Sequence, residues 1–252
     1  MSVMPGAEPY SHDGGEVGVV VCHGYTGTPQ GLRPWAEHLA AAGYTVRLPR
    51  LPGHGTTWRQ LAGTRWQDWY AALEAAFEDL RARCESVFVM GLSMGGTLVL
   101  RLAEQRGSDV AGVVAVNASL LTTRRDAKLL PLLRWVVPSL PPVGNDIAAP
   151  GVVEPAYDRL PVKAAHQLSL LWRQTNADLA RITAPLLVVT SRQDHVVEPL
   201  SSQRLLERAG SADKRQVVLE RSFHVATLDL DADVVVAESL EFVRSHSSLP
   251  AA

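Results

Sequence analysis

Short apolar runs alternate with amphipathic segments along most of this chain of 252 residues. Each run spans only a few residues and ends at a glycine, a proline or a polar cluster, which predicts a buried strand. Strands that alternate with helices predict an α/β fold, with a mostly parallel central sheet flanked by helices on both faces. The predicted strands are Val17 to Cys22, "YTVRLP", "ESVFVMG", Val110 to Asn117, "APLLVVTS" and "RQVVLE".

Three segments between these runs carry apolar residues at helical spacing. They are "PQGLRPWAEHLAAAG", residues 65–83 and Met94 to Gln105. The alternation stops between about Leu120 and Thr175, where the chain is rich in proline and large apolar residues and has no clear strand pattern. A linker would lack this apolar content. We therefore predict a core of residues 1–119 and 176–252, with a small helical cap inserted as residues 120–175.

Composition excludes several classes of function. The 24 Lys and Arg residues nearly balance the 26 Asp and Glu residues, and a net charge of −2 argues against nucleic acid as a partner. The basic run from Thr122 to Lys128 is short enough to be a solvated face. No apolar stretch is long enough for a membrane span, and no signal peptide is recognisable. Cys22 and Cys84 suggest neither a disulfide framework nor a metal site, so we expect a cytoplasmic protein that needs no metal.

The stretch "GLSMGG" places Ser93 among three glycines in an otherwise apolar region. Glycine weakens both helix and strand, so this concentration needs a cause. One reading is a tight turn between closely packed elements. The other is a nucleophile on a strand-to-helix corner, because Gly91 to Gly95 fits the pattern G-x-S-x-G.

Asp194 and His224 favour the second reading. Each follows a predicted strand, and ligand sites of parallel sheets lie at the carboxyl ends of strands. The order Ser, Asp, His is the one expected for a triad whose serine lies on such a corner. Taken singly, Asp194 could instead cap the helix that begins near Pro199, and His224 could be an ordinary loop residue. His195 is a weaker candidate for the base, and His54 in "PGHG" is better explained by a turn.

A serine nucleophile also requires hydrogen-bond donors for the oxyanion that forms during attack. The residue after the nucleophile supplies one backbone N–H, which is that of Met94 here. The loop after the first strong strand, "HGYTGT", supplies the second through Tyr25. Met94 also begins a predicted helix, whose dipole favours negative charge at that end.

Together these motifs resemble the serine hydrolases of the α/β-hydrolase fold. The motifs "VVVCHGYTGTP", "LPRLPGHGTT", "GLSMGG", "SRQDHVVEP" and "SFHVATLD" are similar to those of the bacterial carboxylesterase and monoacylglycerol lipase group. The segment "GNDIAAPGVVEPAYDRLP" resembles the cap of that group. The resemblance implies a triad of Ser93, Asp194 and His224, and it matches Glu154 to a glutamate that binds glycerol hydroxyls in the lipases. Glu154 could equally be a carboxylate on the cap surface.

We therefore expect a cofactor-free esterase that acts on small-molecule esters with short to medium acyl chains through an acyl-serine intermediate, with monoacylglycerols as the favoured substrates. The cap residues expected to line the acyl pocket are Leu129, Leu132, Leu133, Trp135, Val136 and Val137. The alternatives at the same site are a general carboxylesterase, an acyltransferase, a thioesterase or a perhydrolase. A non-catalytic ligand receptor on the same fold is the alternative from another class.

Overall fold

The computed structural model describes residues 3–142 and 145–247, so residues 143–144 of the predicted cap and both chain ends lie outside it. Within these residues the main sheet has seven strands in the order β1-β3-β2-β4-β5-β8-β9. All neighbours pair in parallel except β1, which runs antiparallel to β3 at the edge. The strands are β1 (Tyr10–His12), β2 (Val17–Cys22), β3 (Thr45–Leu48), β4 (Ser86–Leu92), β5 (Gly112–Val116), β8 (Leu186–Ser191) and β9 (Lys214–Leu219).

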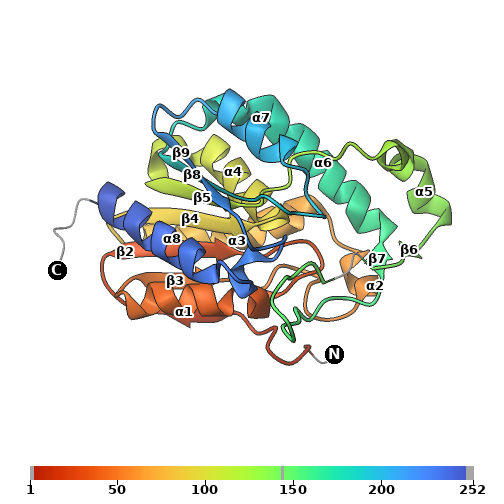
Figure 1. Cartoon of the computed structure of the whole chain (residues 1–252), viewed down its shortest axis with the longest axis horizontal. Coiled ribbons are helices and arrows are strands. Elements are labelled where there is room, and N and C mark those ends of the chain that lie inside the picture. Colours follow the sequence, from red (N-terminus) through yellow and green to blue (C-terminus); the bar gives the residue numbers. More distant parts are fainter. Residues whose placement is uncertain (1–2, 143–144, 248–252) are drawn as a thin grey trace.

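The helices surround this sheet (Figure 1). They are α1 (Arg33–Ala41), α2 (Trp58–Leu61), α3 (Trp66–Arg81), α4 (Met94–Arg106), α5 (Leu130–Val136), α6 (Val162–Asp178), α7 (Leu200–Arg208) and α8 (Ala232–His246). Short 3-10 turns lie at η1 (Pro29–Leu32), η2 (Gly107–Asp109), η3 (Arg125–Leu129), η4 (Leu179–Arg181) and η5 (Ala226–Leu228). Across the described ranges, no helix has both the length and the apolar character needed to cross a membrane.

The predicted α/β fold is confirmed, and all six predicted strands are present. The edge strand β1 was not among them, because three partly exposed residues give no apolar run. The predicted cap region contains η3, α5, most of α6 and a small antiparallel pair, β6 (Ser139–Leu140) and β7 (Leu160–Pro161). The boundary at residue 175 falls inside α6, which packs against α3, α4 and α5. The division at that residue stays a prediction.

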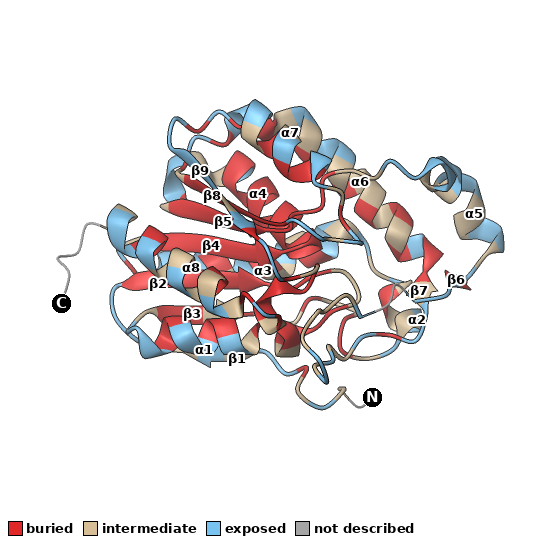
Figure 2. Ribbon diagram, in the orientation of Figure 1, coloured by how far each residue is buried: buried red, intermediate tan, exposed pale blue. Residues whose placement is uncertain are grey.

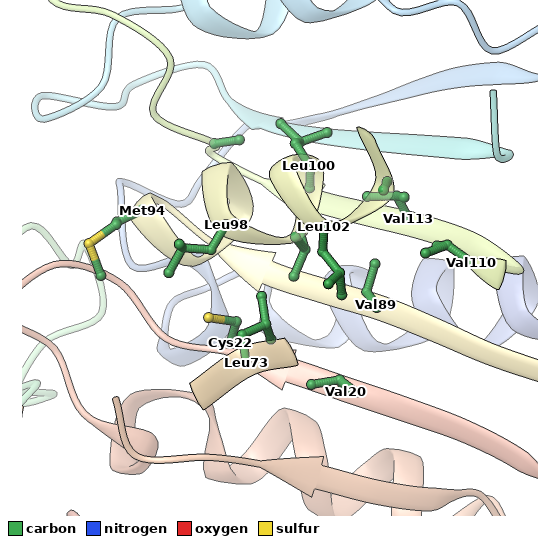
Figure 3. Close-up of a cluster of buried hydrophobic side chains, with 14 of the residues drawn as sticks. Val20, Cys22, Leu73, Val89, Met94, Leu98, Leu100, Leu102, Val110 and Val113 are labelled. Carbon is green, nitrogen blue, oxygen red and sulfur yellow. The ribbon is translucent and has the colours of Figure 1, made fainter. Parts of the chain in front are cut away.

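Two apolar cores form because successive side chains of each strand point to opposite faces of the sheet. On one face, Val20 and Val89 meet Leu73 of α3 and Leu98 of α4 (Figure 3). On the other face, the alternate strand residues pack against α1 and α8. Figure 2 shows the central strands buried along their length, whereas α5 is largely exposed. This two-sided burial leaves the carboxyl ends of the strands as the edge where polar loops converge.

Helix α4 approaches strands β2 and β4 unusually closely, and glycine makes this possible. A Cβ atom at Gly95 would overlap the carbonyl oxygen of Cys22 on β2, and one at Gly91 would overlap the backbone of Gly95. Neither obstacle is a flexible side chain, so neither could move aside. The two glycines therefore set the distance between helix and sheet at the start of α4.

We expect Gly95→Ala to lower the free energy of unfolding by about 3 kcal/mol or more, because the helix must move away from the sheet. Gly107→Ala is the matched control. Gly107 has a φ of 54° with open space where its Cβ would lie, so strain alone should cost about 1–2 kcal/mol. Urea unfolding of both variants measures the difference. Equal losses would contradict a close approach at Gly95.

Candidate active site

Ser93 lies at the corner between β4 and α4, with φ 57° and ψ −120°. A residue with a Cβ atom rarely adopts positive φ, and such strain persists only where the surroundings fix it. The Ser93 N–H donates to the carbonyl of Val116 at 2.9 Å, and its own carbonyl accepts the N–H of Thr97 and of Ser119 at 3.1 and 3.2 Å. The neighbouring strand and the helix thus hold this residue in place from both sides.

Asp194 and His224 meet beyond the ends of β8 and β9. His224 Nδ1 lies 2.8 Å from Asp194 Oδ2, and the two side chains are only 10% and 2% exposed. The other carboxylate oxygen of Asp194 accepts the N–H groups of Val196 and Val197, each at 2.8 Å. Asp194 therefore stabilises its own turn and also orients the imidazole. With Nδ1–H donating to the carboxylate, Nε2 is the nitrogen left to take a proton.

Ser93 and His224 both line a cavity of about 250 Å³ at this end of the sheet. Among the described residues, the Ser93 hydroxyl makes no hydrogen bond to His224. A long separation is common before a substrate is bound, and the bond then forms in the complex. The structure thus places Ser93 and His224 on one cavity, and Asp194 lies outside its lining but is bonded to the His224 ring.

The two predicted oxyanion donors flank Ser93. Met94 is the first residue of α4, and Tyr25 lies in the loop after β2. Neither N–H donates to another described residue. A Cβ atom on Gly24 would lie 3.2 Å from Ser93 Cβ, which shows how closely this loop passes the nucleophile. Both amides are therefore available beside the hydroxyl.

The imidazole of His23 holds the Tyr25 loop. Its Nε2 accepts the N–H of Leu51 at 3.1 Å, so Nδ1 carries the proton and donates to the carbonyl of Gly24 at 3.0 Å. Burial lowers the pKa of His23 to about 4, so the ring stays neutral near pH 7. The Tyr25 hydroxyl adds a bond to the carbonyl of Pro161 on β7, at 2.9 Å. The loop is thus fixed to the core and to the cap region.

Glu154 also lines this cavity, and its carboxylate makes no hydrogen bond to another described residue. It fits against two glycines: a Cβ atom at Gly27 would lie 2.8 Å from its Oε1, and one at Gly31 would overlap it. Its backbone N–H donates to Asn145 Oδ1 at 3.0 Å. Burial raises the pKa of Glu154 to about 7, against the opposing effect of the nearby His224 ring. A carboxylate in this position needs donors that a ligand could supply.

None of the six cap residues predicted to line the acyl pocket lines the cavity that contains Ser93. Leu132, Trp135 and Val136 are 71%, 71% and 77% exposed, and Leu129 is also exposed. Leu133 lines an adjoining groove of about 570 Å³ that shares Leu130 and Leu160 with the cavity, and Val137 lines neither space. Helix α5 is apolar except for Arg134, so its sequence pattern does not indicate which face turns inward. The apolar residues that do line the cavity include Leu121, Leu130, Leu160, Leu168, Trp172 and Val197.

The remaining histidines take structural positions. His54 Nδ1 lies 3.1 Å from the carbonyl of Pro52, in keeping with a turn. His195 Nδ1 lies 2.7 Å from Asp146 Oδ1. Sequence reasoning missed Asp146, because nothing in its local pattern marks it. Among the described residues, no group of His, Cys, Asp or Glu is arranged to hold a metal ion.

Comparison with known proteins agrees with this geometry. The thermostable monoacylglycerol lipase of Bacillus sp. strain H-257 is 43% identical over 248 residues, which cover 97% of each chain. The carboxylesterase of Bacillus subtilis strain 168 is 26% identical and aligns over 94% of this chain and 96% of its own. A solved structure from work on the metagenome-derived lipolytic enzymes LipS and LipT is 42% identical, with a TM-score of 0.95 over 97% of this chain and 100% of that chain.

A family model agrees over most of the chain. The model described as serine aminopeptidase, S33 matches residues 16–231, which include every strand of the main sheet except β1. The match contains the Ser93 corner and the loops that carry Asp194 and His224. The chain therefore belongs to the serine aminopeptidase S33 family of hydrolases and has the α/β-hydrolase fold.

Proposed function

We propose that this hydrolase cleaves carboxylic esters, with monoacylglycerols as its preferred substrates, through an acyl-serine intermediate. One observation carries the proposal. A single cavity contains the Ser93 hydroxyl, the His224 ring and the unpartnered carboxylate of Glu154, beside an apolar wall. A monoacylglycerol has the matching parts, namely an ester, free hydroxyls and an acyl chain. The lipase from Bacillus sp. strain H-257, 43% identical to this chain, supports the same assignment.

The first half of the reaction forms the acyl-enzyme. His224 Nε2 takes the proton of Ser93 as its oxygen attacks the ester carbonyl, and Asp194 stabilises the charged imidazole through the 2.8 Å contact. The N–H groups of Tyr25 and Met94 stabilise the oxyanion, each contributing about 2.7–4 kcal/mol at the transition state. His224 then gives its proton to the departing alcohol.

The second half releases the acid. Water replaces the alcohol, His224 removes one of its protons, and the hydroxide attacks the acyl-serine carbonyl. Collapse of the second tetrahedral intermediate returns the proton from His224 to Ser93. The same two amides serve both halves, because the oxyanion forms at one place.

Glu154 is the proposed recognition element for the glycerol moiety. A carboxylate accepts hydrogen bonds from hydroxyl groups, and the donors that this one lacks in the protein could be the two free hydroxyls of a monoacylglycerol. The apolar wall of Leu130, Leu160, Leu168 and Trp172 is the proposed acyl site. In this proposal residues 120–175 act as the cap that supplies both features, and a receptor without catalysis is disfavoured by the assembled triad.

Ser93→Ala is expected to lower kcat/KM by about 10⁴-fold or more on p-nitrophenyl butyrate and on 1-monolauroylglycerol, because no other group can form the acyl-enzyme. A fluorophosphonate probe should label the parent protein and not the variant. Hydrolysis of neither ester by the parent would contradict the esterase assignment. An alanyl p-nitroanilide belongs in the same panel and should not be cleaved.

Glu154→Gln is expected to reduce kcat/KM for 1-monolauroylglycerol by about 10–100-fold at pH 8, because hydrogen bonds to a charged group contribute about 1.5–3 kcal/mol. Methyl laurate, which has the same acyl chain and no free hydroxyl, should change less than about threefold. Asp158→Asn, an exposed change in the cap, is the control. An equal loss of kcat/KM on both esters would show that Glu154 does not recognise glycerol, and the protein would then be assigned as a general carboxylesterase.

The raised pKa of Glu154 also predicts a pH-dependent stability. Burial moves this pKa from 4.5 to about 7 in the folded protein. Between these values the native state holds a proton that the unfolded chain has lost, so stability falls as pH rises through this window. Glu154→Gln should therefore raise the free energy of unfolding by roughly 1–3 kcal/mol at pH 8 and leave it nearly unchanged at pH 4.5. Urea unfolding at the two pH values measures this, and an equal effect at both would contradict it.

A further inference from the structure

A carboxylate outside the triad contacts both loops that carry the acid and the base. Asp146 Oδ2 accepts the backbone N–H of His224 and that of His195, each at 3.1 Å. Its Oδ1 accepts the Nδ1–H of His195 at 2.7 Å. The carbonyl of Asp146 accepts the N–H of Val225 at 3.1 Å. The side chain of Asp146 is only 13% exposed, whereas that of His195 is 60% exposed. The bond to the His224 N–H is therefore the more buried part of this arrangement.

These contacts connect the same two loops that the Asp194–His224 bond connects. His195 directly follows Asp194 beyond β8, and His224 lies beyond β9, so one carboxylate joins the two loops beside the Asp194–His224 bond. The backbone of His224 is held at its N–H and, through Val225, at the next residue. The ring of His195 also packs edge-on against Phe223, with centroids 4.7 Å apart. Asp146 therefore restricts how far the two loops can separate.

Asp146 belongs to a short segment, residues 145–149, that we call the strap. Asp229 anchors its other end: Oδ2 accepts the N–H of Ala148 at 2.8 Å and that of Phe223 at 2.7 Å, and Oδ1 accepts the N–H of Ala149 at 2.9 Å. The strap is thus hydrogen-bonded to the His224 loop at both ends. A purely apolar contact would let the strap slide along the His224 loop. Hydrogen bonds to backbone amides are directional, so they fix which residues of the two segments lie opposite each other.

The strap also reaches the proposed glycerol site. Asn145 Oδ1 accepts the N–H of Glu154, and Asn145 Nδ2 donates to the carbonyl of Val152 at 3.1 Å. Adjacent residues, Asn145 and Asp146, therefore fix the Glu154 loop on one side and the catalytic loops on the other. This arrangement ties the alcohol-binding part of the cavity to the acid–base pair.

We propose that Asp146 is a positioning residue of the hydrolytic reaction, which holds His224 and the Asp194 loop at the separation that their hydrogen bond requires. The proposal rests on the triad put forward above. Asp146 lines the same cavity as Ser93 and His224. Its side-chain hydrogen bonds go to His224 and His195, so in this proposal it acts through the orientation of His224. Small displacements of a catalytic group are costly, because about 1 Å can reduce the rate by about 100-fold.

The test compares Asp146→Ala, Asp146→Asn and the control Asp158→Ala on p-nitrophenyl butyrate. Asp158 is exposed in the same cap region and bonds to no other described residue. We expect Asp146→Ala to lower kcat by about 10–100-fold with KM changed less than about threefold. Asp146→Asn should recover part of the loss, because its amide oxygen can still accept the His224 N–H. Asp158→Ala should match the parent protein.

Proton NMR supplies a readout that a role in stability alone would leave unchanged. The downfield Nδ1–H signal of the His224–Asp194 bond should broaden or disappear in Asp146→Ala, at a temperature where circular dichroism shows the variant folded. A folded Asp146→Ala with the parent kcat and an intact signal would overturn the proposal, as would a rise in KM at unchanged kcat. If Asp146→Ala fails to fold, the same two measurements, kcat and the downfield signal, are made on Asp146→Asn and interpreted by the same criteria.

Failure of the proposed triad gives a different result. The fluorophosphonate probe should still label the Asp146 variants, more slowly than the parent protein, because Ser93 is present. Undiminished hydrolysis by Ser93→Ala would refute the triad whatever the Asp146 variants do. Parent activity in a folded Asp146→Ala, with Ser93→Ala inactive, would refute the role of Asp146 alone.

Discussion

The close approach of α4 to the sheet is the constraint on which the rest of the site depends. Glycine at positions 91 and 95 lets the backbone of the helix pack directly against β2 and β4. This contact fixes the start of α4, and with it the Ser93 hydroxyl and the Met94 amide. The Tyr25 loop follows β2, one of the same strands, so the same helix-sheet contact positions both proposed oxyanion donors. The packing of this helix on the sheet therefore fixes the positions of the site groups as well as contributing to stability.

The predicted cap region is joined to the core by apolar packing, through Tyr157, Leu168 and Leu171, and also by polar bonds. The Tyr25 hydroxyl bonds to β7, Trp172 Nε1 donates to Ser119 Oγ at 2.7 Å, and Glu198 accepts the N–H of Thr123 at 2.9 Å. Each of these partners lies next to a part of the proposed active site. Directed bonds of this kind favour one arrangement of cap and core over neighbouring ones.

The sequence was sufficient for the fold and for the proposed triad because both follow from local patterns. A buried strand is recognisable as an apolar run. Ser93 directly follows such a run, and Asp194 and His224 lie in the loops that begin where two others end. The inward face of α5 could not be predicted, because Arg134 is the one polar residue of that helix and a single position does not define an apolar face. Asp146 could not be found either. Its bonds reach residues 49 and 78 positions away, and only the folded chain brings them together.

The positive φ of Ser93 has a consequence for the evolution of the chain. Glycine is the residue that tolerates this conformation best, and it would relieve the strain while removing the nucleophile. Stability and catalysis therefore favour different residues at position 93. Selection for stability alone would favour glycine at this position and so produce a more stable but inactive protein.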